Sequence, residues 1–240
     1  MLFHSTRGND NNKTFEEVLM QGLADDGGLF MPDSWPQVDL DHLKSLKSFI
    51  DVAKYIVPMY TNSSFSIDEV HEVLENTWHD FEEKDYLKIV DINKSLSVLE
   101  LFHGPTAAFK DFGLQLAAAF FNKTLVDQNK TAIVFGATSG DTGSAAIDAC
   151  KEFTAIKSFI LIPDGNMSEI QRKQMTTVDK SNVFPILASG TFDDCQDVVK
   201  KGFKDRSFLK DSQYLLAVNS INWVRTVSYT HLTLPTNACV

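Results

Sequence analysis

The sequence predicts an α/β protein in which a mostly helical segment precedes a mainly parallel sheet. After residue 97, short apolar runs alternate with segments of helical periodicity, a pattern typical of parallel strands joined by crossover helices. Before residue 97, helix-start signals and apolar residues at helical spacing dominate. These two observations predict a helical domain over residues 1–97 and an α/β domain over residues 98–226, followed by a segment of different composition at 227–240.

Two capping boxes predict helix starts in the first segment. Thr14 stands three residues before Glu17, and Ser66 stands three residues before Glu69. In this motif both side chains satisfy free N–H groups of the first helical turn. The run Asp25-Asp26-Gly27-Gly28 predicts a turn that ends the first helix.

In the second segment, short apolar runs typical of strands alternate with stretches of helical periodicity. In open parallel sheets, ligands bind beyond the carboxyl ends of the strands. The loops at residues 104–111 and 138–143, which follow predicted strands, are therefore the candidate sites. The predicted strands span residues 97–102, 131–137, 158–163 and 183–188, and the predicted helices span residues 112–126, 143–153 and 192–203.

Composition narrows the class of protein. The 240 residues carry a formal net charge of −10, which argues against a nucleic-acid or anionic-membrane surface. No apolar run approaches the roughly 18 residues that a membrane span needs, and the polar residues 1–12 are not a secretory signal. The three cysteines form no CxxC pair, so we expect free thiols, no metal site and a cytoplasmic protein.

The loop after the strand at 131–137 has the composition of an anion site. In Gly136-Ala-Thr-Ser-Gly-Asp-Thr-Gly-Ser144, glycines expose backbone N–H groups at a helix start, and Ser139, Thr142 and Ser144 add hydroxyl donors. The same pattern also fits a tight turn with an N-cap. Asp141 would repel an anion, so we expect an N-cap or an acceptor for a protonated ligand group. A nucleotide-binding domain is an alternative, which the lack of GxGxxG and GK[ST] disfavours.

Lys110 is the candidate nucleophile of the other loop. It stands among apolar residues at a strand–loop–helix junction, between Phe102 and Phe112. Apolar surroundings and a helix N-terminus both favour the neutral amine that Schiff-base chemistry requires. The alternative is a lysine that extends to solvent. For His103 we expect a structural role in the loop.

Around these residues the sequence resembles the threonine synthase family of pyridoxal-phosphate (PLP) enzymes. The resemblance is colinear and covers about residues 3–226. Together the matching blocks are far more specific than any one of them. They span residues 5–8, 22–29, 100–111, 138–146, 171–177, 190–196 and 219–223.

The resemblance implies a fold-type II PLP enzyme, similar to the tryptophan synthase β subunit, behind a helical N-terminal domain. It implies that Lys110 holds PLP as a Schiff base and moves protons in the reaction. The family converts O-phosphohomoserine and water into threonine and phosphate. The residues that it places beside the cofactor are Ser139, Gly140, Asp141 and Thr142, and those that it places beside the substrate's anionic groups are Thr138, Ser139 and Thr142.

A third polar block, at Asn219, Asn222 and Arg225, could contact phosphate, since arginine suits bidentate phosphate binding; surface structure is the alternative there. For Arg172 and Lys173 we expect a solvated or interdomain face.

Family members are longer than this chain. We therefore expect the C-terminal half, with the loop for the PLP phosphate and the partner of the pyridine nitrogen, to be missing, and residues 227–240 to be foreign to the family. A chain of this kind alone would be weakly active or inactive. Two other functions remain open: a threonine-synthase-like phospho-lyase, and an inactive binding protein of the same fold. The oligomeric state is not indicated.

Overall fold

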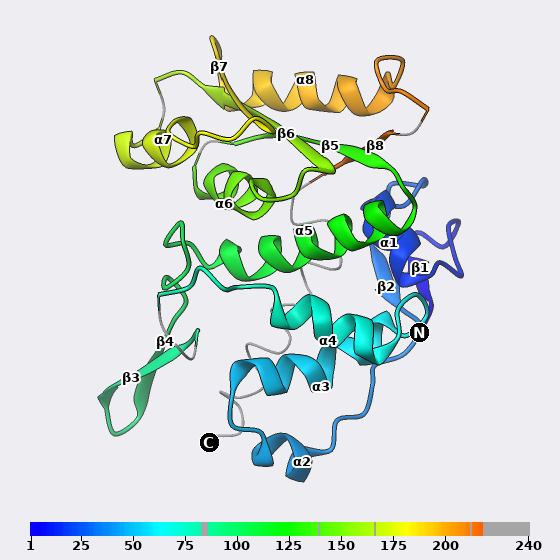
Figure 1. The fold of residues 1–240 in the computed structure, drawn as a ribbon, viewed down its shortest axis with the longest axis vertical. Coiled ribbons are helices and arrows are strands. Elements are labelled where there is room, and N and C mark those ends of the chain that lie inside the picture. The colour runs from blue at the N-terminus through cyan, green and yellow to red at the C-terminus, as the bar shows by residue number, and fades with distance from the viewer. Residues whose placement is uncertain (83–85, 139, 166, 212, 218–240) are drawn as a thin grey trace. The chain divides into compact units, whose positions relative to one another are not determined.

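The structure is a computed structural model that describes residues 1–82, 86–138, 140–165, 167–211 and 213–217 (Figure 1). Asn219, Asn222, Arg225 and the tail at 227–240 lie outside the described residues, as does Ser139. The chain divides into two compact units, one containing residues 1–117 and the other beginning at Ala118. Each unit is described by itself.

The first unit combines helices with two small antiparallel pairs. β1 (Phe3–Ser5) pairs with β2 (Phe30–Pro32), and β3 (Lys88–Asn93) pairs with β4 (Leu96–Glu100). Its helices are α1 (Phe15–Gln21), α2 (Leu40–Ser45), α3 (Phe49–Thr61), α4 (Ile67–Glu75) and the first turns of α5 (Lys110–Asp127).

Both predicted capping boxes are confirmed, because the Thr14–Glu17 and Ser66–Glu69 pairs each make the reciprocal hydrogen bonds at the starts of α1 and α4. The predicted end of the first helix is wrong by a few residues. α1 ends at Gln21, where Gly22 takes a φ of 75° and donates its N–H to the Val18 carbonyl. A glycine in this left-handed region ends a helix without the steric cost of a Cβ.

The β3–β4 hairpin corrects the prediction for the junction between the two segments. A strand was expected at 97–102, in the parallel sheet, and β3 was not expected. The observed β4 pairs only locally, and a two-residue turn at Lys94–Ser95 joins it to β3. The Asn93 side chain fixes this turn by accepting hydrogen bonds from the N–H and hydroxyl of Ser95. Such short-range pairing needs no crossover helix.

The second unit contains a four-stranded parallel sheet with the order β7-β6-β5-β8. α6 (Asp141–Cys150) and α8 (Phe192–Lys204) lie on opposite faces of this sheet (Figure 1). The order reverses beside β5, because β6 and β7 are added on one side and β8 on the other. The carboxyl end of β5 is therefore where such sheets place a ligand. The strands are β5 (Thr131–Ala137), β6 (Ile156–Pro163), β7 (Val183–Ala188) and β8 (Gln213–Leu216).

The predicted strands at 131–137 and 183–188 are confirmed to the residue. Two elements of this unit were not expected, namely β8 and the helix α7 (Glu169–Thr176). α7 escaped detection because Met175 is its only buried residue, so it lacks an apolar stripe. β8 has only four residues, which are too few to show a recognisable periodicity. No helix in the described part of the chain combines the length and the apolar character needed to cross a membrane.

Candidate functional site

Lys110 is the first residue of α5, at the junction that the sequence predicted. Its side chain is half-buried, and its Nζ lies 4.7 Å from the centre of the Phe109 ring. Phe109 is itself 44% exposed. The lysine therefore rests against one partly exposed aromatic face, which is less enclosed than the apolar surroundings we expected.

The loop before Lys110 closes on the side chain of the residue after it. Asp111 is fully buried, and its carboxylate accepts hydrogen bonds from the N–H of Thr106 at 3.0 Å and from the Thr106 hydroxyl at 2.5 Å. Gly104 packs against the same carboxylate, where a Cβ would lie 2.5 Å from Oδ2. The glycine is required because any side chain at position 104 would displace the buried carboxylate.

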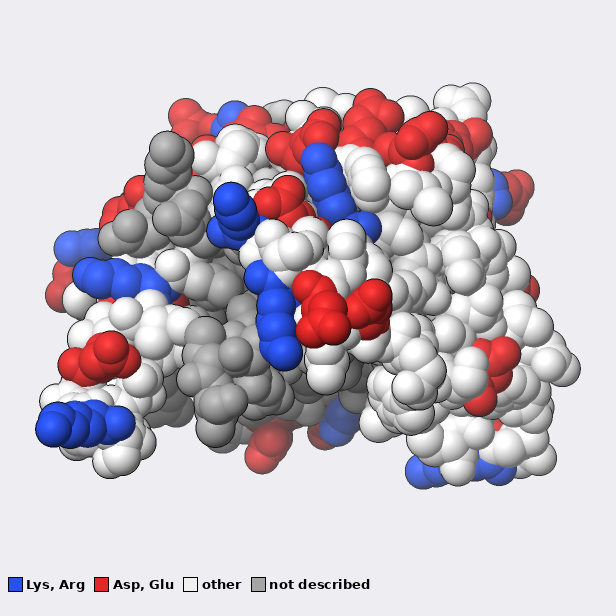
Figure 2. Space-filling model, turned by 90° about the horizontal axis from the view of Figure 1, so that it is seen from below, with Lys and Arg blue, Asp and Glu red and all other residues white. Residues whose placement is uncertain are grey.

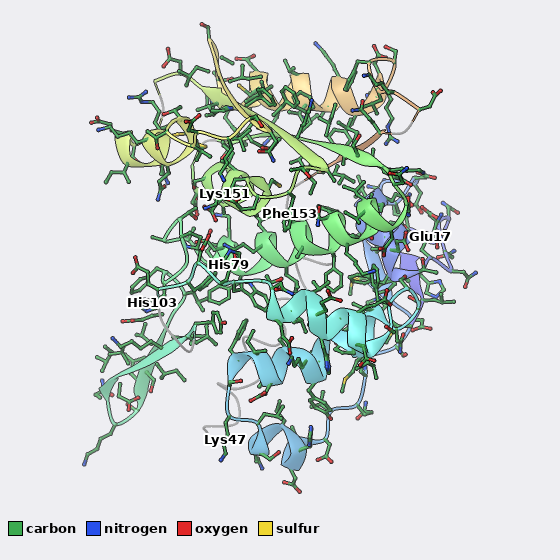
Figure 3. All side chains as sticks on the ribbon, in the orientation of Figure 1. Glu17, Lys47, His79, His103, Lys151 and Phe153 are labelled. Atoms are coloured by element: carbon green, nitrogen blue, oxygen red, sulfur yellow. The ribbon has the colours of Figure 1, made fainter. Side chains whose placement is uncertain are left out.

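His103 has a hydrogen-bond partner, as we expect of a structural loop histidine. Its Nε2 lies 2.8 Å from a carboxylate oxygen of Glu100, the last residue of β4, and both side chains are largely buried. Figure 3 shows His103 beside the inner end of the hairpin. Its carbonyl accepts the N–H of Glu82. These contacts tie the start of the lysine loop to the hairpin and to residue 82.

The loop at 138–143 lies at the carboxyl end of β5 and opens α6. Thr138 is buried, and its hydroxyl oxygen accepts the N–H of Gly140 at 3.2 Å and the N–H of Gly143 at 3.0 Å. The same hydroxyl donates to the Gly140 carbonyl at 2.9 Å. Thr138 therefore shapes the start of α6.

The N-cap role expected for Asp141 is wrong. Gly140 occupies the N-cap position without a side-chain cap, and Asp141 is the first residue of the helix. The hydroxyl of Thr138, two residues earlier, replaces the missing cap. Ser144 also differs from expectation, since it is buried and its hydroxyl donates to the Asp141 carbonyl at 3.2 Å. Thr142 lies half-buried in the first turn.

Two side chains of α7 contact this loop. A Cβ on Gly140 would lie 3.1 Å from the amide nitrogen of Gln171, and a Cβ on Gly143 would lie 2.6 Å from the sulfur of Met175. Sequence reasoning did not single out Gln171, Thr106 or Asp111 as parts of a site. The only signal for Asp111 was a carboxylate in an apolar stretch directly after the candidate lysine.

The cysteines in the described residues are free and buried, as expected. Burial, and secondarily the nearby Asp148 carboxylate, raises the pKa of Cys150 to about 12. Burial also raises the pKa of Cys195. A raised pKa disfavours the thiolate, which is the nucleophilic form of a cysteine. Among the described side chains, no group of His, Cys, Asp and Glu is arranged to hold a metal ion.

The charged groups near the second loop are solvated. Arg172 and Lys173 are exposed on α7, as expected, and Lys173 forms an ion pair with Glu169 at 2.8 Å. Acidic and basic side chains are interspersed on the face that Figure 2 shows. The described residues of that face therefore form no extended basic surface.

The predicted site residues fall into three groups. Thr138, Gly140, Asp141 and Thr142 are brought together at the start of α6 in the second unit. Lys110 belongs to the first unit. The remaining residues, Ser139, Asn219, Asn222 and Arg225, lie outside the described chain.

Two known families match consecutive parts of this chain. Residues 2–78 match the family described as "Threonine synthase N terminus". Residues 91–230 match the family described as "Pyridoxal-phosphate dependent enzyme". The second match contains both the lysine loop and the loop at 138–143.

The curated relatives are threonine synthases and threonine-synthase-like proteins. The chain is 40% identical over 230 residues to a threonine synthase of Pseudomonas aeruginosa, covering 95% of this chain and 49% of the relative. It is 42% identical over 235 residues to that of Schizosaccharomyces pombe, covering 93% and 46%. The chain thus spans about half the length of the curated relatives it matches.

Solved structures of threonine synthases share its fold. The PLP-bound enzyme from Brucella melitensis matches with a TM-score of 0.93 at 36% identity, over 100% of this chain and 52% of that one. The enzyme from yeast matches with a TM-score of 0.90 at 38% identity, over 99% and 50%. The expected fold is confirmed: a PLP-binding α/β domain that follows an N-terminal domain in the sequence. The chain belongs to the pyridoxal-phosphate-dependent enzyme family.

Proposed function

We propose that the protein containing this chain is a threonine synthase, which converts O-phospho-L-homoserine and water into L-threonine and phosphate. The observation that carries the proposal is the position of Lys110, a primary amine at the first residue of α5, at the end of a loop closed around a buried carboxylate. The consecutive family matches at 2–78 and 91–230 support the same activity.

The lysine would do two things. PLP, when bound, supplies an electron sink for reactions at carbons next to an amine. The Nζ of Lys110 would hold the cofactor between turnovers and, once released by the substrate amine, would carry protons as a general base and acid. The Lys110 side chain is half-buried, with its Nζ against the Phe109 ring.

The loop at the start of α6 would hold the anionic parts of cofactor and substrate. Backbone N–H groups at a helix N-terminus bind anions, and this helix starts where the strand order reverses. Thr138 would shape the loop through its bonds to Gly140 and Gly143. Thr142 and the neighbouring positions 139–141 would contact the ligands.

Asn219, Asn222 and Arg225 remain the proposed phosphate contacts of the third polar block. We further propose that residues 1–97 form the N-terminal domain and that residues 98–226 form part of the PLP-binding domain. A cytoplasmic location agrees with the two buried free thiols.

The decisive experiment is a visible absorbance spectrum of the full-length gene product with added PLP, beside Lys110→Ala and the exposed-lysine control Lys47→Ala. Lysine-bound PLP should give a visible band in the parent and in the control, and the band should be lost in Lys110→Ala. Phosphate release from O-phosphohomoserine should fall by roughly 10²–10⁴-fold in the same variant, as expected when a proton-transfer group is removed. A Lys110→Ala protein that keeps the band would refute the assignment of the lysine.

One alternative activity has a specific observation behind it. The chain is 36% identical over 230 residues to a protein named "Threonine synthase-like 2" from Pongo abelii, covering 95% of this chain and 47% of that protein. The phospho-lyase that the sequence left as an alternative would release phosphate without forming threonine. Product analysis by mass spectrometry separates the two activities.

A further inference from the structure

The carboxylate of Asp111 is an unusual neighbour for a reactive lysine. It is 0% exposed, and burying an ionised carboxylate is costly unless hydrogen bonds compensate. Two donors from Thr106 supply such bonds, at 3.0 Å from the N–H and 2.5 Å from the hydroxyl. The carboxylate thus bonds backward across the loop, to a residue five positions earlier in the chain. We call this pair the Thr106–Asp111 clamp.

The rest of the loop is folded around the clamp. The N–H of Ala107 donates to the Gly104 carbonyl at 2.9 Å, and the N–H of Asp111 donates to the Ala108 carbonyl at 3.0 Å. Ala107 has a φ of 55°, in the left-handed region that a non-glycine residue occupies only where its surroundings demand it. Gly104 touches the Asp111 side chain from the other end. The loop therefore has a closed shape in which residues 104 and 111 are in contact.

This shape sets the backbone of Lys110, which immediately precedes Asp111. Its side chain is flexible, so the reach and direction of Nζ depend on where the Cα is held and on the contact with the Phe109 ring. Bond-forming reactions are sensitive to such placement, and an error of about 1 Å can cost roughly 10²-fold in rate.

A second contact holds the other side of Asp111. The indole Nε1 of Trp78 donates to the Phe112 carbonyl at 2.9 Å, and Trp78 is only 1% exposed. The Phe112 ring packs against Phe81 at 4.8 Å and against Phe49 at 5.7 Å between ring centres. Phe49 and Trp78 belong to the segment that matches the N-terminal family. The helical N-terminal segment therefore contacts the first turn of α5 directly.

We propose that the Thr106–Asp111 clamp and Trp78 are positioning elements that set the Lys110 amine for its reaction with PLP. The proposal rests on the proposed function, because it assumes that Lys110 is the lysine that holds the cofactor. It also gives the N-terminal segment a part in the site: Trp78 steadies the helix turn that begins with the lysine.

The test compares Asp111→Asn and Thr106→Val with the parent, in the full-length gene product. Both substitutions keep the shape of the side chain while weakening the clamp. Thr106→Ser restores the hydroxyl and is the rescue variant. Asp91→Asn is the matched control, because Asp91 accepts the Ser97 hydroxyl at 2.6 Å in an exposed hairpin and takes no part in the clamp.

Two readouts are needed besides activity. The first is the rate at which added PLP becomes attached, followed by borohydride trapping and peptide mass spectrometry at Lys110. The second needs no cofactor: the rate at which acetic anhydride acylates Lys110, relative to the exposed Lys47 in the same molecule. Circular dichroism and thermal unfolding establish that each variant is folded.

In folded Asp111→Asn and Thr106→Val proteins, attachment of PLP should slow by about tenfold or more, and the acylation ratio of Lys110 to Lys47 should change. Thr106→Ser and Asp91→Asn should stay within about twofold of the parent. Trp78→Phe, which keeps an aromatic ring but removes the N–H donor, should slow attachment by a smaller factor, with the exposed Trp35→Phe as its control.

Folded clamp variants that attach PLP and acylate at the parental rates would overturn the proposal. If Asp111→Asn does not fold, Thr106→Val decides, because it leaves the backbone bond to the carboxylate in place. Failure of the proposed function looks different. In that case PLP attaches equally well in Lys110→Ala, whereas the cofactor-free acylation ratio still reports whether the clamp positions the amine.

Discussion

The two candidate loops, at residues 104–111 and 138–143, are each held closed by one buried side chain, but the closing groups differ chemically. Each precedes a helix, and each is closed by one buried side chain that packs against a glycine. In the lysine loop the closing group is the carboxylate of Asp111, which bonds backward to Thr106. In the loop after β5 it is the hydroxyl of Thr138, which bonds forward to Gly140 and Gly143.

The difference suits the chemistry proposed for each loop. A carboxylate at the start of α5 complements the positive end of that helix and bonds strongly to its donors, which favours a loop held in one shape. An uncharged threonine shapes the start of α6 without adding a negative charge of its own there. The N–H groups at the start of α6 would attract an anionic ligand, and the Asp141 carboxylate in the same turn opposes that attraction.

The largest expected effects come from the two glycines. A Cβ at Gly104 would lie 2.5 Å from the Asp111 carboxylate, and a Cβ at Gly143 would lie 2.3 Å from Cγ2 of Thr138. Gly104→Ala and Gly143→Ala should each lower the free energy of unfolding by about 1–3 kcal/mol or more, as overpacking of a tight site does. Urea unfolding measures the loss.

A paired variant sharpens this test. Thr138→Ser removes the Cγ2 methyl group and keeps the hydroxyl, so it should recover part of the loss caused by Gly143→Ala, although the contact with Met175 remains. The same serine should have no effect on Gly104→Ala. Equal behaviour of the two glycine variants toward Thr138→Ser would contradict the separate closure of the two loops.

An intermediate effect is expected from Thr138 alone. Thr138→Val keeps the shape of the side chain but removes the acceptor for the N–H groups of Gly140 and Gly143. Loss of such a cap should cost about 0.5–2 kcal/mol, or roughly 2–4 °C in Tm for each kcal/mol in a chain of this size. Thr138→Ser is the control and should stay close to the parent. An unchanged Tm in the valine variant would show that the hydroxyl does not hold the loop.

The smallest expected effect is a pH dependence at a third turn, residues 25–28, which is held by the Asp26 carboxylate. It compares a charged closing group with the uncharged hydroxyl of Thr138. The Ser5 hydroxyl, together with the N–H groups of Gly28 and Asn9, holds the pKa of Asp26 below its ordinary value of 3.8. A lowered carboxylate pKa contributes stability that is present above pH 3.8 and is lost as the pH falls through the folded-state value. Ser5→Ala should therefore destabilise the protein at neutral pH, and the difference from the parent should shrink below pH 3.8.

The measurement is urea unfolding of parent and Ser5→Ala at pH 7 and near pH 3. Thr138→Val is the internal comparison, because a threonine hydroxyl does not titrate and its effect should be the same at both pH values. If the difference in free energy of unfolding between the parent and Ser5→Ala does not change with pH, the charge of Asp26 does not stabilise the turn at residues 25–28.

Local signals in the sequence sufficed for several elements. The capping boxes at Thr14 and Ser66 predicted helix starts because their hydrogen bonds lie within one helical turn. The strands at 131–137 and 183–188 were predicted from short apolar runs, which are typical of strands in parallel sheets. The lysine and its junction were likewise visible, because an amine in an apolar stretch is a local feature.

The sequence by itself thus determined the fold class, the helix starts at Thr14 and Ser66, the strands at 131–137 and 183–188 and the candidate lysine, all of which depend on residues close together in the chain. Only the tertiary structure decided that β8 lies beside β5 and that Trp78 contacts the carbonyl of Phe112. The reason is physical: pairing partners and buried hydrogen bonds are chosen by which distant segments the core brings together, and no local periodicity encodes that choice.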